Sequence, residues 1–149
     1  MEPYKPILNY SPRLTSSFRI ASLFYVALFG GAVALAVIGL MNAHMLRIKG
    51  KKLAMLWVVS IIFVTAKITY DALLLPIAFE RDYRLIAPII KLPDLLFFLF
   101  FHHSLKTPYR LHMIYNGTYH FLFHRGAAPI VGAVSAAIDF AIIMSAITR

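Results

Sequence analysis

Four long apolar segments constrain this chain more than any other feature of its sequence. They cover residues 20–46, 53–79, 85–105 and 127–147, and about 20 apolar residues suffice for a helix that crosses a bilayer. Only helices and closed barrels span lipid, because every backbone polar group must find a partner within the protein. The sequence therefore predicts an all-α integral membrane protein, in which four transmembrane helices form one domain over residues 1–149.

The composition agrees with a multi-pass membrane protein. The chain is 60% hydrophobic and 14% charged, whereas soluble domains carry roughly 25% charged residues. It has 15 Lys and Arg residues against 6 Asp and Glu residues, and most of the basic residues flank the apolar segments. This arrangement predicts contact with a lipid bilayer that has anionic headgroups, and no binding of nucleic acid. With no cysteine, a disulfide framework and a thiolate metal site are excluded.

The third segment is the least regular of the four. It contains Pro88, Pro93 and two charges within residues 85–105, which predicts a kinked helix whose freed carbonyls are satisfied by neighbouring groups. Within it, the run LLFFLFF at 95–101 is interpreted as bulk that faces lipid, with a subunit contact or a hydrophobic groove as alternatives.

The remaining segments connect the predicted spans. Residues 106–125 are aromatic and basic, which predicts an interfacial loop or helix on the membrane surface. Residues 1–18 contain three prolines and are expected to form an irregular tail. Four crossings would place both termini on one side and the connections after the first and third spans on the other. The distribution of Lys and Arg does not decide which side is cytoplasmic.

Five Asp and Lys residues lie inside the apolar segments: Asp71, Asp94, Asp139, Lys67 and Lys91. At a rise of 1.5 Å per residue, the three aspartates lie at similar depths, roughly 12–14 Å from one end of their segments. Lys67 and Asp71 are spaced i, i+4, and Lys91 and Asp94 are spaced i, i+3, so each pair shares a helix face. Because a charge in hydrocarbon is costly, we expect the second, third and fourth helices to converge on a polar core, with the first alongside.

The fourth segment carries a stripe of small residues at helical spacing, on the face that holds Asp139. The stripe consists of Ala128, Gly132, Ser135 and Ala136. Small residues let helix backbones approach closely in membranes. The stripe therefore predicts that this face packs against another helix.

All histidines fall on one side of the predicted bundle or just inside it. His120 and His124 are spaced i, i+4, which is compatible with a metal site or with bis-His haem ligation. His44, His102 and His103 lie near the same predicted boundary. An interfacial position for amphipathic rings explains the same pattern without a cofactor.

Three functions fit these features. The first is a non-catalytic subunit or assembly partner of a larger membrane complex, in which the Asp and Lys pairs neutralise each other and fix helix register. The second is a homo-oligomeric transporter or channel for protons or cations, because three carboxylates against two ammonium groups leave one negative charge inside the membrane. The third is a haem- or metal-binding electron-transfer subunit. Enzyme activity is not favoured, because the sequence shows no recognisable nucleophile or substrate pocket.

Overall fold

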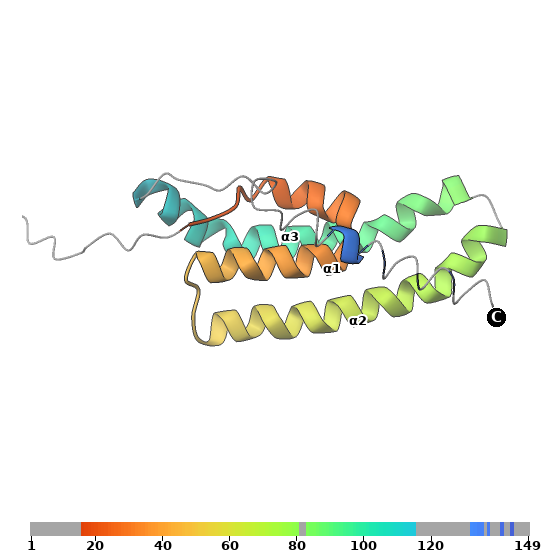
Figure 1. Cartoon of the computed structure of the whole chain (residues 1–149), viewed down its shortest axis with the longest axis horizontal. Helices are drawn as coiled ribbons and strands as arrows, with labels where there is room; N and C mark the ends of the chain where they lie inside the picture. Colours follow the sequence, from red (N-terminus) through yellow and green to blue (C-terminus); the bar gives the residue numbers. More distant parts are fainter. Residues whose placement is uncertain are drawn as a thin grey trace, which may run out of the picture.

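Three helices form the part of the chain that the structure describes. The computed structural model describes residues 16–80, 83–115, 132–135, 137, 141 and 144, of which 75–80, 83–87 and 115 by backbone alone. The helices are α1 (Ser22–Met45), α2 (Lys51–Glu80) and α3 (Tyr83–Tyr115). α2 and α3 run antiparallel along the length of the molecule, and α1 packs against both (Figure 1). Within the described residues the fold is all-helical, as predicted.

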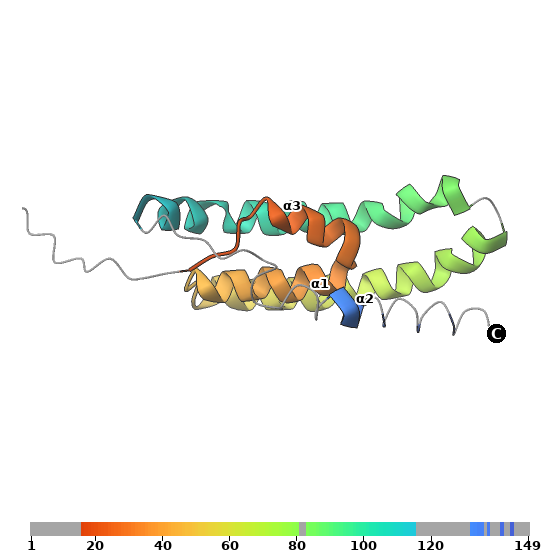
Figure 2. The same cartoon turned by 45° about the horizontal axis from the view of Figure 1, so that its top comes forward.

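α1 is not straight but folds back on itself at Gly31. This residue has φ 67° and ψ −170°, a backbone conformation that is essentially restricted to glycine. Both views show two helical arms joined by a sharp reversal (Figures 1 and 2). Ser17 Oγ and the Phe18 N–H each donate a hydrogen bond to Asn42 Oδ1 at 2.9 Å. In a straight helix, residues 18 and 42 would lie about 36 Å apart.

The reversal changes the path of the first apolar segment. Its arms, residues 22–30 and 32–45, are roughly 14 and 21 Å long at 1.5 Å per residue, and each is shorter than the hydrocarbon core of about 30 Å. A helix therefore forms over most of the predicted range 20–46, but it is interrupted at Gly31, and α1 begins and ends near the same end of the molecule. Residues 16–18 consequently lie beside the end of α1, and not at the opposite side as four crossings would require.

The connection from α1 to α2 is a Schellman turn. The Ile48 N–H donates to the Ala43 carbonyl at 3.1 Å, and the Arg47 N–H donates to the His44 carbonyl at 2.9 Å. Arg47 has φ 54°, the left-handed conformation that closes this turn. The turn leaves the basic residues after Met45 outside the helix end.

α3 continues past the predicted end of the third segment at residue 105. It contains Pro88, Pro93 and Pro108 and ends at Tyr115, so the first part of the predicted interfacial segment belongs to this helix. The extension has a packing cause, because His112 continues the buried face of α3 and is 4% exposed. The rest of 106–125 lies outside the described residues.

One face of α3 forms much of the core. Over residues 88–105 its buried residues are Ile90, Asp94, Phe97, Phe101 and Leu105. Their spacing of three or four residues follows one helix face. The Phe97 ring stacks on Phe63 of α2, with centroids 4.3 Å apart. The interpretation of run 95–101 as lipid-facing bulk is thus wrong for part of the run, while Leu96 and Leu99 stay exposed.

The second arm of α1 approaches α3 closely at a glycine. Phe101 is fully buried, and a Cβ atom at Gly39 would lie 2.6 Å from its ring. A side chain at this position would have to displace an aromatic ring that is enclosed on all sides. Gly39 therefore sets the distance between these two helices.

Two of the described helices have the length and composition of a membrane span. They are residues Lys51–Leu74 of α2 and, when its two arms are counted together as one helix, α1, with mean hydropathies of 1.9 and 2.4. These helices favour a membrane location. Four crossings stay a prediction, because α1 folds back and most of the segment 127–147 lies outside the described residues; its described positions are helical.

Candidate functional site

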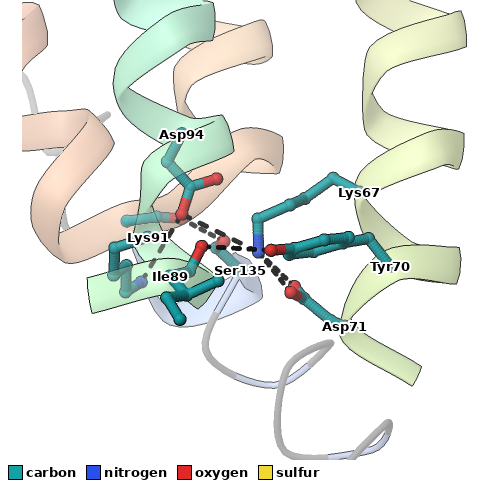
Figure 3. Close-up of polar contacts among 8 residues, drawn as sticks. Lys67, Tyr70, Asp71, Ile89, Lys91, Asp94 and Ser135 are labelled. Carbon is teal, nitrogen blue, oxygen red and sulfur yellow. Dashed lines mark hydrogen bonds and ion pairs between the residues drawn. The ribbon is translucent and has the colours of Figure 1, made fainter. Parts of the chain in front are cut away.

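Four of the five predicted intramembrane charges meet between α2 and α3. The Lys67 ammonium of α2 forms an ion pair and hydrogen bonds with both carboxylate oxygens of Asp71, one turn away (Figure 3). It also lies 3.9 Å from Asp94 Oδ2 of α3. The Lys91 ammonium lies 3.7 Å from the same Asp94 oxygen. We call these four residues the charge cluster.

Burial within the charge cluster is uneven. Asp94 is 1% exposed and Lys67 is 7% exposed, whereas the Lys91 side chain is 42% exposed. Lys67 therefore contacts both carboxylates from a buried position, while Lys91 reaches Asp94 from the surface. Two carboxylates and two ammonium groups balance in formal charge. The described cluster can thus fix the register of α2 against α3 without a charged partner from another chain.

Asp139 would be the fifth charge of this core, and it lies outside the described residues. The expectation that the fourth segment supplies a third carboxylate therefore stays a prediction. With Asp139 present, the core would hold one more negative than positive charge, and that carboxylate could hold a proton or a cation.

A hydrogen bond beside the charge cluster satisfies a backbone carbonyl of α3 that lacks its usual helical donor. Proline has no N–H, so Pro93 leaves the carbonyl of Ile89, four residues earlier, without its helical donor. The Tyr70 hydroxyl of α2 donates to this carbonyl at 3.2 Å (Figure 3). The Tyr70 ring also lies 6.0 Å from the Lys67 ammonium. Sequence reasoning missed Tyr70, because the proline marks the freed carbonyl but not the side chain that reaches it.

The Tyr70 bond should depend on Pro93. Replacing Tyr70→Phe is expected to cost about 1 kcal/mol of folding free energy, since it removes one hydrogen bond and leaves a carbonyl unpaired. In a Pro93→Ala background the alanine N–H can bond to Ile89, so the same change should cost much less. Unfolding in mixed micelles, measured for the four proteins of this double-mutant cycle, gives the coupling. Equal costs in both backgrounds would show that the tyrosine hydroxyl does not serve the freed carbonyl.

Ser135 connects the fourth segment to the reversal of α1. Its hydroxyl donates to the carbonyl of Gly30, and the residue is 2% exposed. A broken helix in a membrane is tolerated only where protein groups satisfy the freed backbone, and Ser135 supplies such a group. Both cartoons place the described helical residues of this segment at the elbow of α1 (Figures 1 and 2), and the close-up draws Ser135 in the region of the charge cluster (Figure 3).

The other members of the predicted small-residue stripe are less informative. Gly132 has open space where a Cβ would lie, so it is not a close-packing position here. Ala128 and Ala136 lie outside the described residues. Of the stripe, Ser135 alone has a described contact, and that contact is a hydrogen bond.

The structure does not bring the predicted haem or metal candidates into one described site. His44 is exposed and lines a groove between α1 and α2, whereas His102 lies against Phe98 of α3 with centroids 5.6 Å apart. His103 is exposed. His120 and His124 lie outside the described residues. Among the described residues, no group of three His, Cys, Asp or Glu side chains is placed to hold a metal ion.

The reversal of α1 was the other feature that sequence reasoning missed. The Gly30-Gly31 pair in the middle of an apolar run is a turn signal, and Asn42 near the end of that run is an unusual polar residue. Neither signal alone shows that the chain before the helix returns to Asn42. Comparison with protein-family models, with curated proteins and with solved structures gives no match to this chain.

Proposed function

We propose that this chain is a multi-pass membrane protein that acts as a non-catalytic subunit or assembly partner of a larger membrane complex. The observation that carries the proposal is that most of α2 is exposed, with few contacts to the rest of the chain. Only 17% of the residues in the most apolar 18-residue window of Lys51–Leu74 are buried by the rest of the chain. Its large exposed apolar side chains are Met55, Trp57, Val58, Ile61, Ile62, Ile68 and Leu73. A helix so little covered by its own protein must meet lipid or another chain.

The charge cluster supports a structural role for the polar residues. Its charges balance within the described chain, and the contacts join α2 to α3. Buried ion pairs are weak sources of stability but can specify one helix register. A fixed register would present the bare side of α2 in one orientation to a partner.

A stripe on the bare side of α2 offers a contact for a partner helix. Thr65, Thr69 and Ala72 are exposed and spaced at i, i+4 and i+7. Both threonine hydroxyls bond to carbonyls of their own helix, at 2.9 and 3.0 Å. The stripe is therefore small and has its polar groups satisfied, which lets a second helix approach closely.

Native mass spectrometry of the protein, extracted gently from its own membrane, tests the subunit role. We expect a heteromeric mass for the wild type, and loss of that mass in Thr69→Phe, because a ring there would hold a partner helix away. Leu99→Phe on the exposed face of α3 is the matched control and should keep the complex. A monomer or homo-oligomer as the only wild-type species would contradict the subunit role.

Ion-coupled transport by a homo-oligomer is the second candidate, and the broken helix favours it. Interrupted helices next to buried charges form the ion sites of many transporters. α1 reverses at Gly31, the adjacent Gly30 carbonyl accepts a hydrogen bond from Ser135, and Ser135 is drawn in the region of the charge cluster (Figure 3). This candidate requires pH-dependent flux in liposomes that contain only this protein, with loss of flux in Asp94→Asn. Such flux together with a homo-oligomeric mass would favour transport over the subunit role.

A further inference from the structure

A groove lies between the second arm of α1 and the first half of α2. Its volume is about 580 Å³, within the range of about 300–1,000 Å³ that is typical of ligand pockets. The lining is apolar apart from His44, Ser60 and Thr65. Met41, Trp57 and Ile61 line it and are exposed. The groove is therefore open along its side to whatever surrounds the protein.

The length of the groove matches one leaflet of a bilayer. On α1 its lining runs from Val33 to Met45, and on α2 from Thr65 back to Leu53. Twelve residue steps along a helix correspond to about 18 Å, and one leaflet contributes about 15 Å, half of the hydrocarbon core. A chain that enters beside Met45 and Leu53 would end near the middle of the bilayer.

The outer end of the groove is strongly cationic. The chain between its two outermost lining residues, Met45 and Leu53, carries four basic residues, all of them exposed: Arg47, Lys49, Lys51 and Lys52. Among the described residues none of these four has an ion-pair partner. The first turn of α2 contains no acid. The apolar groove thus ends at a concentration of positive charge with which no described acidic side chain forms an ion pair.

We propose that this groove holds one phospholipid with an anionic headgroup. One acyl chain would lie along the apolar groove, and the phosphate would contact the cations of residues 47–52. A neutral hydrophobic ligand would fill the groove but leave these cations without an anionic partner. An anionic lipid would place its acyl chain in the apolar groove and its phosphate beside the cations. Basic pockets beside membrane helices bind such headgroups. The inference rests on the membrane location proposed above, but not on the subunit role.

Native mass spectrometry of purified protein in detergent, with added lipid, tests this site. We expect palmitoyl-oleoyl phosphatidylglycerol to bind much more tightly than phosphatidylcholine with the same chains. In a variant with Lys49→Gln, Lys51→Gln and Lys52→Gln, the affinity for phosphatidylglycerol should fall on the order of 100-fold, about fivefold for each lysine near the headgroups. Lys106→Gln with Arg110→Gln, which neutralises two exposed cations of α3, should leave the affinity unchanged.

A groove-filling variant separates the apolar part of the site from its charges. Met41→Trp places a large side chain at the exposed rim of the groove and should lower binding of both lipids. Equal binding of the two lipids by the wild type, or unchanged binding in the triple lysine variant, would overturn the proposal. Because the measurement uses the purified chain, absence of a heteromeric complex would not affect it. Failure of the chain to insert into vesicles would defeat the membrane location itself.

Discussion

Replacing Lys67→Met should destabilise the protein more than any other single change in the charge cluster, by about 3–5 kcal/mol. Lys67 is 7% exposed and contacts both Asp71 and Asp94. Without the Lys67 ammonium, the Asp71 carboxylate loses the cation described beside it, although its side chain is only 13% exposed. Asp94 loses one of its two neighbouring cations and keeps Lys91. A loss of this size is a large part of the stability of a typical domain. We therefore expect a sharp fall in abundance in the membrane and a lower midpoint of unfolding in mixed micelles.

A compensating change distinguishes lost charge pairing from simple loss of packing. In the double variant Lys67→Met with Asp71→Leu, both members of the closest pair become apolar, and Asp94 keeps Lys91. Replacement of a whole buried pair by apolar residues is often neutral, so the double variant should recover most of the stability. Lys91→Met, which removes a cation that is 42% exposed, should have a small effect. A single Lys67→Met variant as stable as wild type would contradict the role given to the charge cluster.

The positions of the buried charges could be predicted because they depend on local rules. Spacings of i, i+4 and i, i+3 fix which side chains share a helix face, and the cost of charge in hydrocarbon indicates that such faces turn inwards. Lys67, Asp71 and Asp94 accordingly meet in the interior, whereas Lys91 reaches Asp94 from the surface with its side chain 42% exposed. The same rules could not locate Tyr70, because its bond to the carbonyl freed by Pro93 depends on how α2 and α3 are placed in space.

The path of α1 could not be predicted by the same reasoning, because an apolar run of sufficient length fits both a crossing and a hairpin. Hydropathy averages over a window, and one glycine at positive φ does not change that average. What decides the path is a set of contacts remote in sequence: Asn42 bonds to Ser17 and Phe18, and Ser135 bonds to Gly30. The end of α3 was misplaced for a related reason, since tertiary packing of His112 extends a helix that local composition would end earlier.

Removing the two glycines at the elbow should open the hairpin of α1. Gly31→Ala places a side chain at φ 67° and ψ −170°, which costs on the order of 1–3 kcal/mol. A Cβ atom at Gly30 would lie 2.6 Å from the Cβ atom of Ala34, so Gly30→Ala also opposes the reversal. Each alanine favours a continuous helix over glycine by about 1 kcal/mol. The double variant is therefore expected to lose the folded-back form of α1.

Single cysteines can report this change, because the chain contains none. Cysteines introduced at Ser16 and at Lys49 should react with a membrane-impermeant thiol reagent from the same side of sealed vesicles, since α1 begins and ends near one end of the molecule. A cysteine at Glu80, at the other end of α2, should react from the opposite side. In the Gly30→Ala, Gly31→Ala variant, the cysteine at 16 should no longer react from the same side of the vesicles as the cysteine at 49.

Gly132→Ala provides the matched control, because a Cβ there meets no atom within 4 Å and labelling should stay as in the wild type. If the cysteines at 16 and 49 react from opposite sides in the otherwise unchanged protein, α1 crosses the bilayer as one helix and the hairpin is refuted. The two outcomes also bear on function. A hairpin that survives in the membrane keeps the Gly30 carbonyl and its Ser135 partner buried beside α2 and α3, where a subunit contact or an ion site would depend on it. A straight α1 would remove the interrupted helix that favours transport, and leave the bare face of α2 as the feature that requires a partner.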